Sequence, residues 1–194
     1  MFRTLKKIGK GLYKEKGSKF YGYALPCKSV DDVKKNLEKL RKEHPGCVHV
    51  CYAYCLGSKK ENHRYSDDGE PSNSAGAPIY GQIKSFDLTN TLIAVVRYYG
   101  GINLGVGGLI NAYRSAAKEA VFSSEIVDDE EYNTIEIEFT YASMPFVMNE
   151  VKSSECIILE QHFEDLPVLK LSIPISNSEL IHRLENLNDV VIKA

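Results

Sequence analysis

The 194-residue sequence has no long apolar run. No stretch approaches the roughly 18 consecutive apolar residues that cross a bilayer as a helix. Residues 1–17 also contain no apolar core of the kind that a secretion signal requires. The five cysteines are an odd number in a chain without a secretion signal, which argues for reduced thiols rather than a disulfide framework. We therefore expect a cytoplasmic protein with no membrane partner.

Each end of the chain is poor in charge of one sign. Residues 1–64 carry sixteen Lys and Arg against six Asp and Glu, whereas residues 122–194 carry four against fifteen. Basic segments attract phosphate-rich partners by counterion release and electrostatic steering. Any contact with nucleic acid is therefore expected in the N-terminal part. The alternative is that the basic residues between Lys34 and Lys42 are only the solvated face of a helix.

Periodicity indicates mixed strands and helices in the first two thirds of the chain. Residues 91–99 form an almost unbroken apolar run, typical of a buried central strand, and residues 47–56 alternate as its expected neighbour. The predicted elements are paired strands within 12–25 around a turn at 16–18, a helix from Ser29 to Pro45, a strand over 47–56, a polar loop over 57–74, a short helix around 78–83, a strand over 91–99 and a helix from 108 to about 123.

The acidic, polar segment 124–131 is interpreted as a boundary between domains of residues 1–126 and 132–194. The predicted elements beyond it are strands over 134–140, 157–162, 168–175 and 190–192, with helices over 144–151 and 178–187. The order β-α-β-β-α-β is that of a small ferredoxin-like domain. The fold class predicted for the whole chain is α+β.

Five glycines lie between positions 100 and 108: Gly100, Gly101, Gly105, Gly107 and Gly108. Glycine loses more backbone entropy on folding than any other residue, so this density indicates positive φ or close approach to another group. Between a buried strand and the start of a helix, their amides would face outward at the positive end of the helix dipole. This arrangement favours an anion site, and the alternative is close packing of the strand against the helix.

Known nucleotide and metal motifs do not fit these segments. No Lys-Ser or Lys-Thr pair follows the glycines, and Gly105, Gly107 and Gly108 do not have the spacing of the dinucleotide fingerprint. The carboxylates of Asp67, Asp68 and Glu70 lack the spacing of a calcium loop. They could bind a metal, act as acid and base, or cap their own loop, and capping is favoured. We predict no cofactor.

Cys47, His49, Cys51 and Cys55 alternate, and so they are expected on one face of a strand. Same-face neighbours on a strand stand nearly 7 Å apart by rise alone, too far to share one tetrahedral zinc ion without a bulge or turn. Buried thiols are the preferred interpretation, and the sequence predicts neither a metal site nor a catalytic residue.

Several short motifs are spread along the chain. They are Lys16-x-Ser18-x-Phe20, His49-x-Cys51, Ser-Asp-Asp-Gly-Glu-Pro at 66–71, Arg-Tyr-Tyr-Gly-Gly at 97–101, and Leu104, Gly105, Gly107, Gly108, Leu109, Ala112 and Tyr113. Together they resemble the signature of the IMPACT/YigZ family, also called uncharacterised protein family 0029, and the similarity runs through most of the chain. One departure is Asn73-Ser74, where the family commonly has Gly-Thr.

The resemblance implies an N-terminal domain similar to the second domain of ribosomal protein S5. It implies a C-terminal ferredoxin-like domain similar to the last domain of elongation factor G. Eukaryotic relatives act in translational control by binding a ribosome-associated activator of a stress kinase, so a ribosome-associated protein is one possible partner.

The leading hypothesis is a non-enzymatic regulatory or binding protein linked to translation. It would contact RNA, the ribosome or a translation factor through the glycine-rich loop face. Arg64, Arg97 and Arg114 would contact phosphate, and Tyr65, Tyr98, Tyr99 and Tyr113 would offer stacking faces. The candidate site residues are Arg64, Ser66, Asp67, Asp68, Glu70, Ser74, Arg97, Tyr98, Gly100, Gly101, Gly105, Gly107, Gly108 and Tyr113.

Two alternatives remain at this stage. One is an enzyme acting on a phosphorylated small molecule or nucleotide, with Asp67, Asp68 and Glu70 holding Mg²⁺ or acting as base. The other is a protein-interaction module whose acidic C-terminal domain recognises a basic partner.

Overall fold

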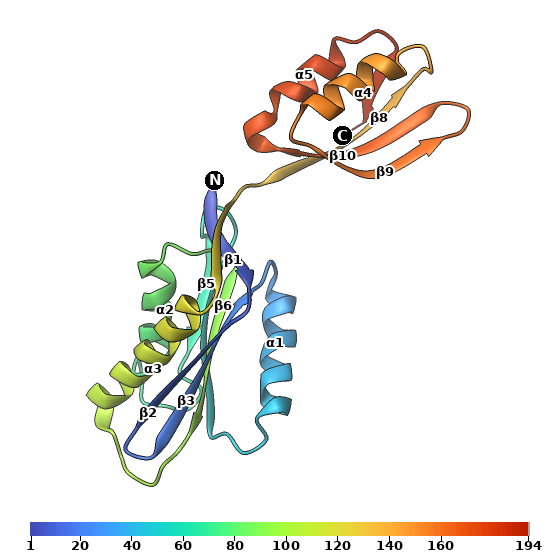
Figure 1. Cartoon of the computed structure of the whole chain (residues 1–194). Coiled ribbons are helices and arrows are strands. Elements are labelled where there is room, and N and C mark those ends of the chain that lie inside the picture. The colour runs from blue at the N-terminus through green and yellow to red at the C-terminus, as the bar shows by residue number, and fades with distance from the viewer. Residues whose placement is uncertain (194) are drawn as a thin grey trace. The chain divides into compact units, whose positions relative to one another are not determined.

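The computed structural model describes residues 1–193. The chain divides into two compact units, and the boundary falls between Asp129 and Glu130. Each unit has its own hydrophobic core, since no buried side chain belongs to the clusters of both. Among the described residues, no helix combines the length and apolar character needed to span a membrane. The chain is of the mixed α/β kind, with helices packed on sheets in both units (Figure 1).

The N-terminal unit is built on a five-stranded antiparallel sheet of order β2-β3-β6-β4-β5. Strands β4 and β6 pair from His49 opposite Arg97 to Cys55 opposite Thr91, which confirms that they are neighbours. The predicted first strand pair is also confirmed. Its elements are β1 (Phe2–Lys7), β2 (Gly9–Glu15), β3 (Ser18–Pro26), α1 (Val30–Glu43), β4 (His49–Leu56), β5 (Asn62–Ser66), α2 (Gly76–Ser85), β6 (Thr91–Tyr98), α3 (Gly105–Phe122) and β7 (Glu125–Asp129).

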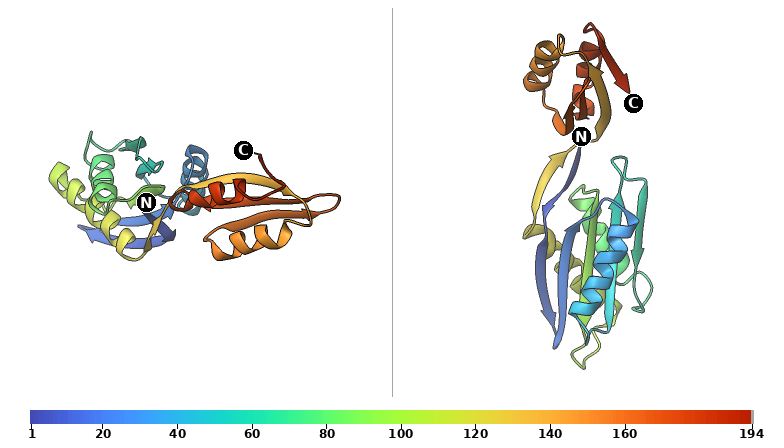
Figure 2. Two further views of the ribbon diagram at one scale, coloured as in Figure 1. Left: turned by 90° about the horizontal axis from the view of Figure 1, so that it is seen from above. Right: turned by 90° about the vertical axis from the view of Figure 1, so that its right-hand side faces the viewer.

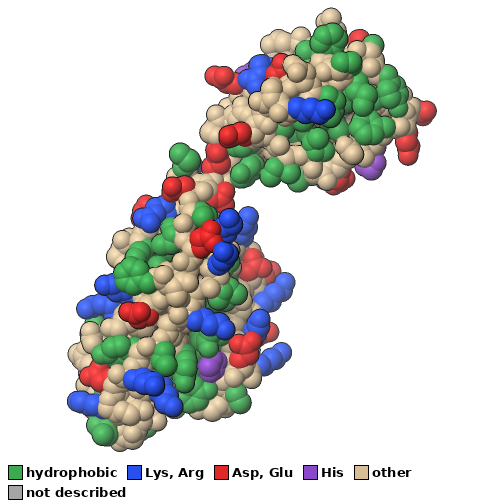
Figure 3. All heavy atoms as spheres, in the orientation of Figure 1, with side chains coloured by type: hydrophobic (Ala, Val, Ile, Leu, Met, Phe, Trp, Pro, Cys, Tyr) green, Lys and Arg blue, Asp and Glu red, His purple; other side chains and the backbone are tan. Residues whose placement is uncertain are grey.

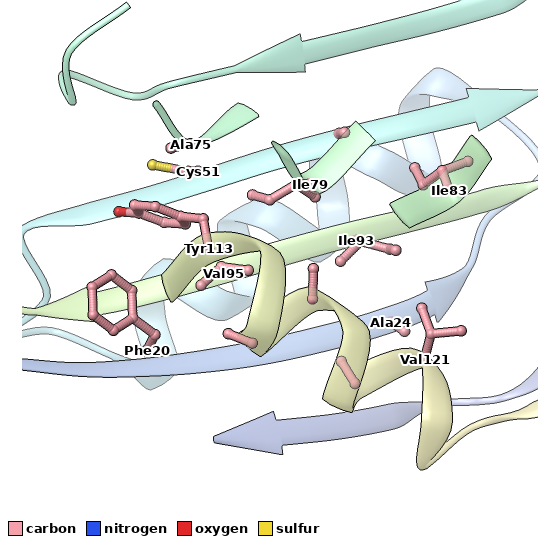
Figure 4. Close-up of a cluster of buried hydrophobic side chains, with 14 of the residues drawn as sticks. Phe20, Ala24, Cys51, Ala75, Ile79, Ile83, Ile93, Val95, Tyr113 and Val121 are labelled. Carbon is pink, nitrogen blue, oxygen red and sulfur yellow. The ribbon is translucent and has the colours of Figure 1, made fainter. Parts of the chain in front are cut away.

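Helices lie on both faces of this sheet. Helices α2 and α3 pack on one face, where Phe20, Ile79 and Tyr113 are fully buried (Figure 4). Helix α1 packs on the other face and buries Val33 and Leu40. Seven of the eight residues of β6 are buried because this strand lies between the two layers, as its apolar sequence predicts.

Helix α1 shows how local sequence sets an element's limits. The Ser29 hydroxyl accepts a hydrogen bond from the Asp32 amide at 3.1 Å, so Ser29, and not Asp31, is the N-cap of the two residues that the sequence allows. Asp31 and Asp32 lie in the first turn and Arg41 and Lys42 in the last, which suits the helix dipole at both ends. The helix ends before Pro45, as expected.

Three strands, β1, β5 and β7, have no counterpart among the predicted elements. β5 lies inside the expected polar loop, and most of its residues are exposed because it is the edge of the sheet. β1 and β7 form a separate two-stranded antiparallel sheet. β7 lies within the acidic segment that the sequence predicts as a domain boundary, and Lys7 forms an ion pair there with Glu125 at 2.7 Å. Composition did not reveal these strands because their stability depends on distant partners.

The C-terminal unit contains one four-stranded antiparallel sheet of order β11-β8-β10-β9. Both of its helices pack on one face, where Val147 and Val151 of α4 and Leu180 and Leu184 of α5 meet the strand side chains. The order β-α-β-β-α-β is the predicted one. The elements are β8 (Tyr132–Phe139), α4 (Met144–Ser153), β9 (Ile157–Phe163), β10 (Pro167–Pro174), the short 3₁₀ helix η1 (Ile175–Asn177), α5 (Glu179–Glu185) and β11 (Val190–Lys193).

Candidate functional site

The loop between β5 and α2 is organised by the carboxylate of Asp67. One oxygen accepts hydrogen bonds from the amides of Ala75 and Gly76 at 3.0 and 2.8 Å, and the other accepts from Asn73 at 2.9 Å. These bonds satisfy donors at the start of α2, so Asp67 is a helix cap, as favoured from the sequence. Asn73 has a φ of +61°, a left-handed conformation that asparagine tolerates well.

Asp68 holds the same loop against α1 and β4. Its carboxylate accepts hydrogen bonds from the Val50 amide at 2.7 Å and the Arg41 guanidinium at 2.8 Å. Its backbone carbonyl lies 2.7 Å from Nδ1 of His49, so that nitrogen carries the hydrogen. The role of Arg41 cannot be predicted from local sequence, because 27 residues separate it from Asp68.

Glu70 is the centre of a buried network on the α3 side of the sheet. Its Oε1 atom accepts hydrogen bonds from Arg97 at 2.5 Å and from the Tyr113 hydroxyl at 2.8 Å, and His49 Nε2 lies 3.9 Å away. The side chains of Glu70 and Arg97 are only 4% and 8% exposed. Charge-assisted bonds of this kind compensate for the removal of both charges from water.

This network changes the expected roles of two candidate residues. The Arg97 guanidinium lies 5.4 Å from the ring centre of Phe20 and 5.4 Å from that of Tyr99, and it is bonded to Glu70. It is not exposed for phosphate contact. Tyr113 is fully buried and cannot offer a stacking face. The expectation that Arg97 contacts phosphate is therefore wrong. Its partner Glu70 lies in a loop 27 residues earlier, so the sequence around Arg97 does not reveal the buried ion pair.

The cysteines of β4 are buried thiols. Cys51 donates to the Asp67 carbonyl at 2.9 Å, and burial raises the pKa of its thiol well above the ordinary value. Burial also raises the pKa of Cys55. Cys47 precedes the strand and packs on the α1 face, away from Cys51 and Cys55, so the expected four-residue face does not form. No group of three or more His, Cys, Asp or Glu side chains within residues 1–193 is placed to hold a metal ion.

The five glycines of the loop have two different structural roles. A Cβ atom on Gly100 would lie 2.0 Å from the carbonyl carbon of Gly17, so Gly100 permits close backbone packing. In contrast, a Cβ atom on Gly101, Gly105 or Gly107 would meet nothing within 4 Å. Gly108 is intermediate, since its Cβ would approach Leu104 at 3.0 Å. Close packing therefore accounts for Gly100, whereas the backbone at Gly101, Gly105 and Gly107 lies beside open space.

The N-terminus of α3 opens beside these unobstructed glycines. The helix begins at Gly105, which has a φ of +71°, and residues 105–107 are exposed. No side chain caps it and its first turn contains no acidic residue. The amides of a first helical turn lack partners within the helix and carry the positive end of its dipole. This arrangement can bind an anion.

The remaining candidates are distributed over other parts of the unit. Arg64 is exposed on β5, whereas Ser74 is fully buried and donates to the Pro71 carbonyl at 2.6 Å. Ser66 accepts a weak hydrogen bond of 3.3 Å from the Asp68 amide. Tyr98 lies on the α1 face, where its hydroxyl is 2.9 Å from His44. The structure therefore groups Glu70, Arg97 and Tyr113 and separates Tyr98 from them.

Comparison with known proteins finds a protein family whose members are similar to this chain. The model of the Impact N-terminal domain matches residues 16–121. IMPACT family member YvyE of Bacillus subtilis (strain 168) is 29% identical over 84% of this chain and 75% of its own length. An IMPACT family member of Haemophilus influenzae is 31% identical over 77% of this chain and 73% of its own length.

One solved structure, described as the crystal structure of a hypothetical protein, aligns with 100% of this chain and 96% of its own. Its TM-score is 0.75 at 24% identity, which supports the fold alone. The family model covers more than half of the chain, from the hairpin of β2 and β3 to the last turn of α3. The chain therefore belongs to the IMPACT family.

Proposed function

We propose that this chain is a non-enzymatic binding protein linked to translation, and that it contacts RNA through the N-terminus of α3 and the glycine loop before it. The surface in question consists of residues 101–108.

We further propose that the N-terminal unit is similar to the second domain of ribosomal protein S5. The β-α-β-β-α-β order and the 4-1-3-2 arrangement of strands support a ferredoxin-like C-terminal unit.

The observation that carries this proposal is the uncapped start of α3. Gly105, Val106 and Gly107 are exposed, and the space around Gly105 and Gly107 is open. Because Gly105 and Gly107 lack a Cβ atom, a phosphate oxygen can approach the backbone amides closely there. A side-chain cap or an acidic first turn would have satisfied the same donors, and α3 has neither.

The charge of the N-terminal unit supports a polyanionic ligand. Residues 1–129 contain twenty Lys and Arg against fourteen Asp and Glu, while residues 130–194 contain four against twelve. A basic unit draws RNA toward it, and the acidic unit does not. The link to translation rests on the resemblance to the IMPACT family, whose eukaryotic members act in translational control.

The carboxylates do not favour the alternative of an enzyme acting on a phosphorylated molecule. Asp67 accepts from three backbone amides, Asp68 from Arg41 and Val50, and Glu70 from Arg97 and Tyr113. Each carboxylate is thus engaged in holding the loop. No observation favours this alternative over binding.

The experiment is a filter-binding titration of a short single-stranded RNA against the Gly107→Glu variant. The new carboxylate would lie in open space at the third position of α3, where it repels phosphate and interacts favourably with the helix dipole. We expect RNA affinity to fall by about tenfold while thermal stability is unchanged or higher.

Gly81→Glu is the matched control, because Gly81 lies in the middle of α2 with nothing within 4 Å of its Cβ position. This variant makes the same charge change away from the proposed surface, so its RNA affinity is expected to fall much less. Equal affinities for the two variants would contradict the proposal.

A further inference from the structure

A second surface on the N-terminal unit joins aromatic rings to unpaired lysines. Cross-strand partners in an antiparallel sheet point to the same face. Lys10 pairs with Tyr23, Lys14 with Lys19, and Lys19 with Tyr98, so these side chains share the α1 face of the sheet. We call this surface the tyrosine–lysine platform, and it consists of Lys10, Lys14, Lys19, Tyr21, Tyr98 and His44.

The platform is not covered by a helix. Helix α1 contacts β4 and β6, and the right-hand view in Figure 2 shows it beside, rather than over, β2 and β3. Leu12, which pairs with Tyr21 on the same face, is 44% exposed. On the visible face of this unit, Figure 3 shows Lys and Arg side chains interspersed among hydrophobic ones.

A groove of about 470 Å³ opens at one end of the platform, a volume typical of small-ligand sites. Lys19, Tyr21, His44, Tyr98 and Tyr99 line it together with Gly17. Its walls are therefore mostly aromatic, with one lysine at the edge.

The rings of this groove are held in position by one another. His44 lies between two hydroxyl groups, with Nδ1 at 2.9 Å from Tyr98 Oη and Nε2 at 2.6 Å from Tyr23 Oη. The rings of Tyr21 and Tyr98 meet edge to face at 5.8 Å. A planar ligand would therefore contact aromatic side chains that are already held in position, and this limits the entropy cost of binding.

The lysines of the platform have no internal countercharge. Within residues 1–193, none of Lys10, Lys14 and Lys19 forms an ion pair with a carboxylate. Lys14 and Lys19 are direct cross-strand partners, an arrangement of like charges that destabilises a sheet. Both are exposed. An external anion between them would remove this repulsion.

We infer that the tyrosine–lysine platform binds single-stranded RNA, with one unpaired base in the aromatic groove and its neighbouring phosphates on Lys14 and Lys19. Stacking rings beside cationic side chains are the usual means of binding unpaired nucleotides. An acidic peptide would satisfy the lysines but would leave the aromatic groove unused. This inference rests on the proposed function, because it takes RNA as the ligand, but it concerns the opposite face of the sheet from α3.

The test uses the full chain and the Lys14→Ala/Lys19→Ala double variant, with a short fluorescently labelled single-stranded RNA as probe. We expect affinity to fall by about tenfold, and the slope of log affinity against log salt to decrease in magnitude by about 1.4, for two phosphate contacts. The Lys34→Ala/Lys35→Ala variant of α1 removes the same charge from an exposed site outside the platform. It is expected to change the slope little.

A second measurement separates the contribution of the base to RNA affinity from that of the phosphates. An abasic oligonucleotide keeps the phosphates, so the wild-type chain is expected to bind it more weakly than the base-containing RNA, and Tyr21→Leu is expected to remove this difference. NMR resonances of Tyr21 and Tyr98 ring protons should shift only with the base-containing RNA.

The outcomes separate the two proposals. Equal affinities of the two double lysine variants, or ring resonances that do not respond, would overturn this inference while leaving a Gly107→Glu effect to support the proposed function. Absence of any RNA binding by the wild-type chain at low salt would overturn both.

Discussion

At the scale of residues, the ion pair of Glu70 and Arg97 fixes the loop between β5 and α2. Glu70→Gln would leave the Arg97 guanidinium buried without a countercharge. Breaking a buried pair in this way costs about 3–5 kcal/mol, so we expect the free energy of unfolding to fall by that amount in chemical denaturation.

The matched control for this prediction is the double variant Glu70→Leu/Arg97→Met. Replacing both charges with apolar side chains removes the penalty of an unpaired charge, so the double variant is expected to be more stable than Glu70→Gln. Wild-type stability in Glu70→Gln would show that the pair does not hold the loop.

The buried thiol of Cys51 and hydroxyl of Tyr113 predict loss of stability in alkali. Burial raises the pKa of Cys51 above its ordinary value of 9.0 and that of Tyr113 above 10.0. The unfolded chain releases both protons at the ordinary values, whereas the folded chain retains them. Their contribution to stability is therefore complete below about pH 9 and decreases as the pH rises above it.

Denaturation of the Cys51→Ala variant checks this prediction. Above about pH 9, removing one titrating thiol should reduce the dependence of unfolding free energy on pH by up to about 1.4 kcal/mol per pH unit. The same pH dependence in wild type and variant would exclude the thiol as its source.

Sequence patterns predicted some residues at the site and missed others for clear reasons. Asp67 was predicted as a cap because the carboxylate stands shortly before a helix. Side chains alternate along a strand, so the sequence implies that Arg97 and Tyr98 face opposite sides of the sheet, as they do. The burial of Arg97 could not be predicted, because it depends on Glu70, which lies 27 residues away.

At the scale of elements, the contact between α3 and the first hairpin depends on glycine. A Cβ atom on Gly22 of β3 would lie 2.2 Å from the Ala116 carbonyl oxygen of α3. Gly22→Ala is therefore expected to lower the free energy of unfolding by about 1–3 kcal/mol, because helix and strand must separate to accommodate the methyl group.

Gly81→Ala is the corresponding control in α2. Its Cβ position is open, so replacing a helical glycine with alanine should raise stability by roughly 0.5–1 kcal/mol. Chemical denaturation of both variants checks the pair, and a Gly22→Ala chain as stable as wild type would contradict the close packing.

Elements with a strong local pattern were predictable, whereas edge strands were not. β6 was evident because it is buried on both faces, and α1 because its cap and apolar stripe coincide. β5 and β7 contain mainly polar residues, and their pairing with β4 and β1 supplies the hydrogen bonds that define them. Local sequence contains no signal for such long-range partners.

At the scale of the whole molecule, the separation of the cores predicts that the N-terminal unit folds alone. The clusters of residues 1–129 share no buried side chain with that of residues 130–194. A fragment of residues 1–129 is expected to unfold cooperatively and to retain the RNA affinity of the full chain, because the proposed contacts lie within it. Circular dichroism during denaturation and RNA titration check this, and a fragment without a cooperative transition would contradict it.

The central claim is that the free amides at the start of α3 bind phosphate. The most direct measurement is a titration of the ¹⁵N-labelled chain with single-stranded RNA, followed by amide NMR. We predict that the resonances of Val106, Gly107 and Gly108 shift with RNA and return as salt is added. RNA that binds while these three amides remain unchanged would contradict the account.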